Sequence, residues 1–110
     1  MSEIIVIAHN IRSTFNIGSI FRTCEGFGVS KIIISGYSPY PKLLVGDTRL
    51  PYISEKLTEQ IHKTALDAET MVPFEYQAEP DLDFLKKAGY TIVGLEQDKR
   101  SIMITIIILG

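Results

Sequence analysis

The sequence contains one cysteine, Cys24, among its 110 residues, and it has no long apolar run. A single thiol excludes an internal disulfide and a cysteine-only metal cluster, and it is compatible with a reducing compartment. The most apolar segment, residues 102–109, is far shorter than the roughly 20 residues that span a bilayer. The first residues also lack the basic and long apolar regions of an export signal. We therefore expect a cytoplasmic protein without a membrane span.

Excess positive charge, metal-binding histidine patterns and nucleotide-binding glycine motifs are also missing. The 11 Lys and Arg residues against 13 Asp and Glu residues give a net charge of −2, so contact with nucleic acid must come from a local patch. His9 and His62 are not at metal-ligand spacing from each other or from Cys24, which predicts no metal site. No GxGxxG motif follows the first predicted strand, and no P-loop is present. The length predicts one domain, residues 1–110, with a single core.

Short β-branched segments alternate with segments of helical periodicity along the chain. Strands are predicted at residues 4–8, 31–35, 72–77, 90–95 and 102–109, and helices at residues 17–27, 53–68 and 82–88. Strands joined through a helix are normally parallel, so we expect an α/β fold with a mostly parallel sheet and flanking helices. The last strand is apolar enough to be predicted as buried.

Local signals predict where these elements begin and end. Gly28 and Gly89 stand where the first and third helices should stop, and Asp81 is positioned to cap the third helix. Pro73 removes a donor from the hydrogen-bond ladder, which places residues 72–77 at a strand start or at the edge of the sheet.

Polar residues gather in the segment that follows the first strand and enters the first helix. Asn10, Arg12, Ser13, Asn16 and Arg22 supply amides, guanidinium groups and a hydroxyl, which suit phosphate oxygens and ribose hydroxyls. Ligands of open α/β sheets bind at the carboxyl ends of the strands, and a helix N-terminus adds partial positive charge there. This segment is the main candidate site.

The same segment resembles the first motif of the SpoU (TrmH-like) family of SPOUT-class RNA methyltransferases, N-x-R-S-x-x-N-x-G-x-x-x-R-T. It matches at every fixed position, namely Asn10, Arg12, Ser13, Asn16, Gly18, Arg22 and Thr23. Residues 63–69, followed by Val72 and Pro73, are similar to the family's K-T-A-L-G-A-E…V-P segment, but Asp67 replaces the usual glycine. If the family needs a positive φ at that position, Asp67 is strained there.

The resemblance implies a SPOUT-like (α/β knot) architecture, with the knot region absent because Gly110 looks like the first glycine of the second motif. It implies methyl transfer from S-adenosylmethionine to a ribose 2′-hydroxyl of tRNA or rRNA, by a homodimer. Residues 92–96 resemble the strand whose end lines the family's cofactor pocket. The resemblance assigns Gly94, Leu95, Glu96 and Gly110 to the cofactor.

The same matching assigns Arg22 and Asn16 to catalysis, and Asn10, Arg12 and Ser13 to the RNA backbone. Arginine is a poor base, so Arg22 is expected to hold a phosphate or to stabilise the developing alkoxide. A phosphate oxygen, or Arg22 itself with a depressed pKa, would take the proton. An alternative function is a non-catalytic RNA-binding or assembly module, or a truncated fragment, that kept the first motif and lost the cofactor half.

Structural roles compete with these assignments. Arg22 has Glu25 three residues ahead, as in an exposed helical ion pair, and Asn16 could cap the first helix. Gly18 could permit close packing of that helix on a strand. Cys24 lies on the apolar stripe of the helix, which favours a core position over a reactive thiol.

Overall fold

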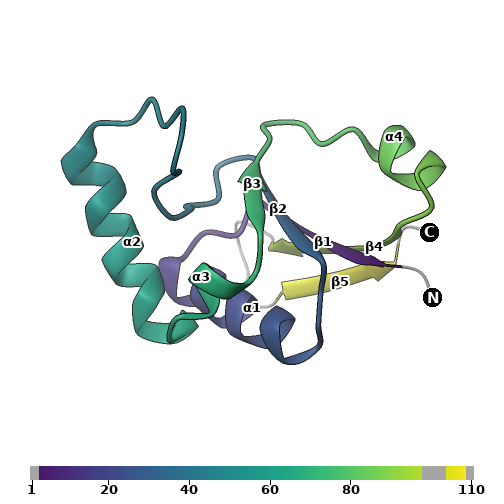
Figure 1. The fold of residues 1–110 in the computed structure, drawn as a ribbon, viewed down its shortest axis with the longest axis horizontal. Helices are drawn as coiled ribbons and strands as arrows, with labels where there is room; N and C mark the ends of the chain where they lie inside the picture. The colour runs from purple at the N-terminus through teal and green to yellow at the C-terminus, as the bar shows by residue number, and fades with distance from the viewer. Residues whose placement is uncertain (1–2, 98–103, 109–110) are drawn as a thin grey trace.

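The computed structural model describes residues 3–97 and 104–108, which form a five-stranded sheet flanked by helices (Figure 1). The strands have the spatial order β3-β2-β1-β4-β5. They are β1 (Ile4–His9), β2 (Lys31–Ser35), β3 (Phe74–Tyr76), β4 (Thr91–Gln97) and β5 (Ile104–Ile108). The helices are α1 (Thr14–Gly26), α2 (Pro51–Ala65), α3 (Ala68–Met71) and α4 (Leu82–Lys87). The first four strands are parallel and β5 is antiparallel to β4, which confirms the predicted α/β class with a mostly parallel sheet.

The two faces of the sheet are covered by different helices. Because successive side chains of a strand point to opposite faces, Val6 and Ala8 pack with α1 and α2, whereas Ile5 and Ile7 pack with Leu85 of α4. The first face carries the larger core, and α4 alone covers part of the second (Figure 1). The sheet is thus a layer between unequal helical coverings, and its α4 face leaves room for a cavity.

Several predicted boundaries are confirmed. Asp81 caps α4 by accepting a hydrogen bond from the Phe84 backbone N–H at 3.0 Å. Gly28 and Gly89 have φ values of 68° and 90° just after α1 and α4, a backbone conformation that glycine adopts without strain. Pro73 directly precedes the edge strand β3, as its missing N–H requires.

The helix predicted over residues 53–68 is confirmed as far as Ala65, but its continuation to Ala68 was wrong. Left-handed residues Leu66 (φ 50°) and Asp67 (φ 76°) end α2, and α3 starts at Ala68. The helical stripe continues through the break because both helices pack on α1, so the sequence pattern alone does not reveal the turn. Asp67 therefore has a positive φ, a conformation that glycine would adopt there without strain.

The strand predicted at residues 102–109 is confirmed for Ile104–Ile108, but its predicted burial was wrong, and residues 102, 103 and 109 lie outside the described residues. Only Ile104–Ile108 are described there as a strand, and Ile106 and Ile108 are 69% and 75% exposed. β5 is the outer strand of the sheet, and its only described strand neighbour is β4. The apolar composition of β5 therefore does not correspond to burial among the described residues.

Gly18 lets α1 approach another helix, and not a strand as we predicted. A Cβ atom at this position would collide with the Thr64 hydroxyl and the Ile61 carbonyl oxygen, and would lie 2.9 Å from the Ala65 backbone nitrogen. All three belong to α2, which makes the most extensive contact with α1. The motif glycine thus sets the distance between the two helices.

Cys24 is a core residue, as predicted, with only 5% of its surface exposed. Burial disfavours the thiolate and raises the pKa of Cys24 to about 11. We expect iodoacetamide at pH 8 to alkylate the folded chain far more slowly than the urea-unfolded chain, since the thiolate is the nucleophile. The rate can be followed by mass spectrometry, and equal rates in the two states would contradict the burial of Cys24.

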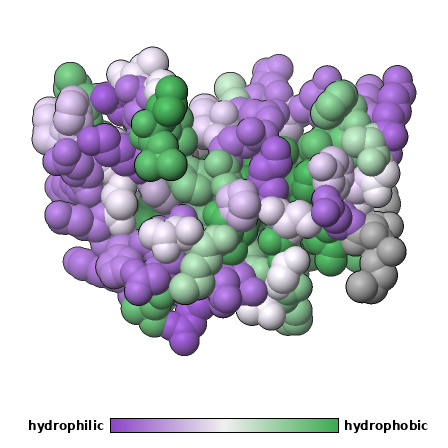
Figure 2. Space-filling view, viewed as in Figure 1, coloured by the Kyte–Doolittle hydropathy of each residue, from purple (hydrophilic) through white to green (hydrophobic). Residues whose placement is uncertain are grey.

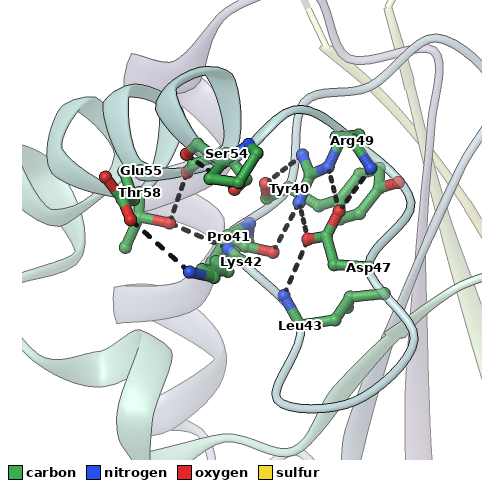
Figure 3. A network of polar contacts seen from close by, with 10 residues as sticks. Tyr40, Pro41, Lys42, Leu43, Asp47, Arg49, Ser54, Glu55 and Thr58 are labelled. Carbon is green, nitrogen blue, oxygen red and sulfur yellow. Dashed lines mark hydrogen bonds and ion pairs between the residues drawn. The ribbon is translucent and has the colours of Figure 1, made fainter.

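The long connection between β2 and α2 is held in shape by Arg49 and Asp47 (Figure 3). The Arg49 guanidinium donates to the Tyr40 and Pro41 carbonyl oxygens and to the Asp47 carboxylate, and it lies 3.6 Å from the centre of the Tyr40 ring. The Asp47 carboxylate also accepts from the Leu43 backbone N–H. These contacts join residues within the connection between β2 and α2 and so fix its shape. Hydrophobic surface is visible over this connection (Figure 2).

This network predicts a pH-dependent contribution to stability. The hydrogen bonds from Arg49 hold the pKa of Asp47 well below its usual value, so the folded state favours the ionised carboxylate. The stabilisation is present above the unfolded pKa of about 3.9 and is lost as the pH falls through the folded pKa. We expect the difference in unfolding free energy between wild type and Asp47→Asn to shrink as pH is lowered from about 7 to about 3.

Urea denaturation at a series of pH values would measure this difference. In an Arg49→Met background the effect of Asp47→Asn should be much smaller, because the main hydrogen-bond partner is gone. A difference that is independent of pH would show that the pair does not favour the ionised carboxylate.

Candidate functional site

A cavity of about 300 Å³ opens at the carboxyl ends of the parallel strands, on the α4 side of the sheet. Its lining comes from four strands, from Pro80 and from the first residue of α4: Ile7, His9, Ser35, Pro80, Leu82, Gly94, Leu95, Glu96 and Ile107. The cavity is therefore lined by Gly94, Leu95 and Glu96, three of the four residues that the family resemblance assigns to the cofactor. The fourth, Gly110, lies outside the described residues.

The strand register explains why these residues meet. β1 lies between β2 and β4, with His9 opposite both Ser35 and Glu96, and Ile7 opposite Gly94. In parallel strands of matched register the carboxyl ends form one edge, so side chains distant in sequence line the same opening. Gly94 has no side chain, which leaves space between Ile7 of β1 and Ile107 of β5, its neighbours on the two adjacent strands.

His9 and Ser35 form a polar pair in the cavity wall that sequence reasoning missed. The His9 ring nitrogen Nδ1 lies 2.8 Å from the Ser35 hydroxyl, which is completely buried. The sequence suggested only that His9 is a hydrogen-bonded or solvated residue, and the first of these is confirmed. His9 and Ser35 are the last residues of two adjacent parallel strands, and this shared place at the strand ends is the signal that could have revealed the pair.

Asn10 joins the ends of β1 and β2. Its φ of 53° is a left-handed conformation that asparagine tolerates better than most residues. Its backbone N–H donates to the Ser35 carbonyl, and its side-chain Oδ1 accepts from the Tyr37 N–H at 3.1 Å. A Cβ at Gly36 would collide with that Oδ1. Asn10 therefore shapes the loop beside the cavity.

Ser13 and Arg12 complete the polar loop. Ser13 is the N-cap of α1 and accepts from the Asn16 N–H at 3.0 Å, so the alternative reading of Asn16 as the cap was wrong. The Arg12 backbone N–H donates to Oε1 of buried Gln97 at 3.0 Å, which ties the loop to the end of β4. Sequence reasoning did not single out Gln97, because its partner is 85 residues away.

Arg22 is an exposed residue of α1 that makes no hydrogen bond or ion pair with the other residues that the structure describes, so the suggested pair with Glu25 is not seen. It lies eight residues after the first residue of α1, about 12 Å along the helix axis. α1 covers the sheet face opposite the cavity. The structure therefore gathers Asn10, Arg12 and Ser13 at the strand ends, but it does not bring Arg22 to Gly94 and its neighbours.

Among the described residues, no helix is long and apolar enough to cross a bilayer. The chain matches no protein-family model. It is 30% identical over 105 residues to a mouse tRNA (guanosine(18)-2′-O)-methyltransferase, TARBP1, an alignment that covers 92% of this chain and 6% of the mouse protein. This chain therefore spans a small part of that relative.

Two solved structures share the fold. Both are of an rRNA methyltransferase from Sinorhizobium meliloti, one of them with AdoMet bound. Each superposes with a TM-score of 0.50 at 22% identity, covering 79% of this chain and 28% of the bacterial chain. The likeness confirms the predicted fold class and is consistent with the SPOUT-like architecture that the sequence motifs imply.

Proposed function

We propose that this chain is part of a SpoU-type RNA methyltransferase that transfers a methyl group from S-adenosylmethionine to a ribose 2′-hydroxyl of tRNA or rRNA in the cytoplasm. The observation that carries this proposal is the 30% identity with a tRNA 2′-O-methyltransferase along 92% of the chain. The complete first motif, in the loop at the carboxyl ends of the strands, supports the same chemistry.

The cavity at the strand ends suits the cofactor. Its volume of about 300 Å³ is at the lower end of the range for small-molecule sites. Gly94 and Leu95 would border the apolar part of the ligand, and the exposed Glu96 carboxylate would accept hydrogen bonds from ribose hydroxyls or from an ammonium group. S-adenosylmethionine, when bound, supplies a methyl group on a positively charged sulfur.

Asn10, Arg12 and Ser13 would hold the RNA backbone beside this cavity. The exposed Arg12 offers a planar guanidinium to phosphate, and the Ser13 hydroxyl retains a proton to donate while it caps α1. The attacking 2′-hydroxyl must lose its proton as the methyl group moves. We assign Arg22 to the phosphate or to the developing negative charge on that oxygen, with a phosphate oxygen as proton acceptor and Asn16 as an orienting group.

A homodimer is part of the proposal because one chain does not unite the two halves of the site. Arg22 projects from the helical layer on one face of the sheet, and the cavity opens on the other face. In a suitably arranged dimer, Arg22 of one copy would face the cavity of its partner. Light scattering would show whether the chain forms the dimer that this arrangement requires.

Calorimetric titration of S-adenosylmethionine into the folded chain tests the proposal directly. We expect one site per chain with a Kd in the micromolar range, about −8 kcal/mol. Glu96→Gln should weaken binding, whereas Glu59→Gln on α2 is a matched control that should not. Failure of a folded chain to bind the cofactor would indicate a truncated fragment or a non-catalytic module, with methyl transfer belonging only to a longer form.

A further inference from the structure

The turn between α2 and α3 brings together one imidazole and two carboxylates. His62 Nδ1 lies 2.8 Å from Glu69 Oε2 and 3.7 Å from Asp67 Oδ1, and one ligand atom of each residue lies within 4.8 Å of the others. His62 is in the last turn of α2, Asp67 is in the left-handed turn, and Glu69 is in α3. Sequence reasoning predicted no metal site because it compared His62 only with His9 and Cys24.

Glu69 is an unusual member of this cluster because its carboxylate is buried. Only 7% of its side chain is exposed, and its Oε1 atom has no hydrogen-bond partner among the residues that the structure describes. A buried carboxylate oxygen without a partner is costly, since it has lost its water without gaining a donor. A cation bound beside the His62–Glu69 pair would contact the carboxylate that the protein leaves incompletely satisfied.

We propose that His62, Asp67 and Glu69 form a binding site for Zn²⁺. In tetrahedral zinc sites with ligand distances of about 2.0–2.1 Å, two ligand atoms lie about 3.4 Å apart. This value falls between the distances from His62 Nδ1 to Glu69 Oε2, 2.8 Å, and to Asp67 Oδ1, 3.7 Å. Small side-chain adjustments therefore place all three residues in the first coordination sphere, with a fourth position for water. The imidazole favours Zn²⁺ over Mg²⁺ and Ca²⁺, which prefer oxygen ligands.

The backbone of the turn creates this arrangement. Consecutive left-handed residues Leu66 and Asp67 reverse the chain, so that Asp67 and Glu69 return toward His62 one turn back on α2. A glycine at position 67, as in the resembling family, would remove one of the ligands. Bound zinc would connect α2 to α3. This site is independent of the proposed methyl transfer, because none of the three residues lines the cavity at the strand ends.

Titration with ZnCl₂ tests the site in the 110-residue chain, by calorimetry and by the rise in thermal unfolding temperature. We expect one ion per chain and weaker binding of MgCl₂. Asp67→Asn keeps a residue that tolerates a left-handed φ and removes the charged ligand, so it should lower the Zn²⁺ affinity more than tenfold without preventing folding. His62→Gln should have a similar effect.

His9→Gln removes the other histidine and Glu59→Gln removes an exposed carboxylate of α2, so both should bind Zn²⁺ like wild type. The proposal is overturned if wild type does not bind Zn²⁺, or if Asp67→Asn binds it as tightly as wild type. Binding of Mg²⁺ as tight as that of Zn²⁺ would also overturn it. None of these three results would bear on the cofactor titration, so the two proposals can fail separately.

Discussion

Replacing Gly18 by alanine is expected to destabilise the protein by about 1–3 kcal/mol, a large part of the stability of a small domain. The added Cβ would overlap the Thr64 hydroxyl, which donates a hydrogen bond to the Phe15 carbonyl at 2.8 Å. It would also overlap the Ile61 carbonyl oxygen, which is backbone and cannot rotate away. α2 would therefore have to move away from α1. Urea denaturation followed by circular dichroism would measure the loss.

Gly26→Ala is the matched control for this experiment. Gly26 is in the same helix, and no atom lies within 4 Å of the position that its Cβ would occupy. Alanine is the better helix former, so this change should be neutral or stabilising by up to about 1 kcal/mol. If both substitutions changed stability equally, close packing of α1 on α2 would not be the reason for the glycine at position 18.

Replacing Arg22 by alanine is expected to lower methyl transfer to RNA by about 10²–10³-fold, as removal of one group that stabilises developing negative charge does in other enzymes. The guanidinium is exposed and unpaired among the described residues, so stability should change by less than about 0.5 kcal/mol. Transfer of labelled methyl groups from S-adenosylmethionine to bulk tRNA and rRNA would measure the effect.

Two comparisons make this test specific. Arg22→Lys keeps the charge but loses the planar pair of donors, so it should restore RNA affinity more than the rate. Lys56→Ala removes an exposed cation from α2 and should leave the rate unchanged. The slope of log RNA affinity against log salt concentration gives a further readout. If Arg22→Ala reduces this slope by about 1, Arg22 contacts a phosphate. Unchanged methyl transfer in a folded Arg22→Ala variant would remove this residue from the mechanism.

Much of the sheet could be predicted from local sequence. β-branched runs such as residues 4–8 and 31–35 form strands because their stiff side chains fit a sheet that is covered on both faces. Asp81, Gly28 and Gly89 end or cap helices through their own backbone and side-chain chemistry, so neighbours in the chain are sufficient to predict them. The polar loop at residues 10–13 could be located for the same reason.

Other features depend on contacts between distant segments. The exposed antiparallel edge strand β5 has the composition of a buried strand, and only its place in the sheet shows that nothing described covers it. Gly18 is explained by Ile61 and Thr64 of α2, which are more than 40 residues away in sequence. The pair of His9 and Ser35 follows from strand register, and the unsatisfied oxygen of Glu69 from burial.

The sequence by itself determined the strands, the main helices and the mostly parallel arrangement, because these depend on local propensity and spacing. The link to RNA methylation came from the resemblance of residues 10–23 to a family motif. Tertiary structure decided which motif residues share a face. It placed Gly94, Leu95 and Glu96 around a cavity and put Arg22 on the opposite side of the sheet. The physical reason is that side-chain direction alternates along strands and rotates along helices, so residues of one motif separate or meet only when the elements pack.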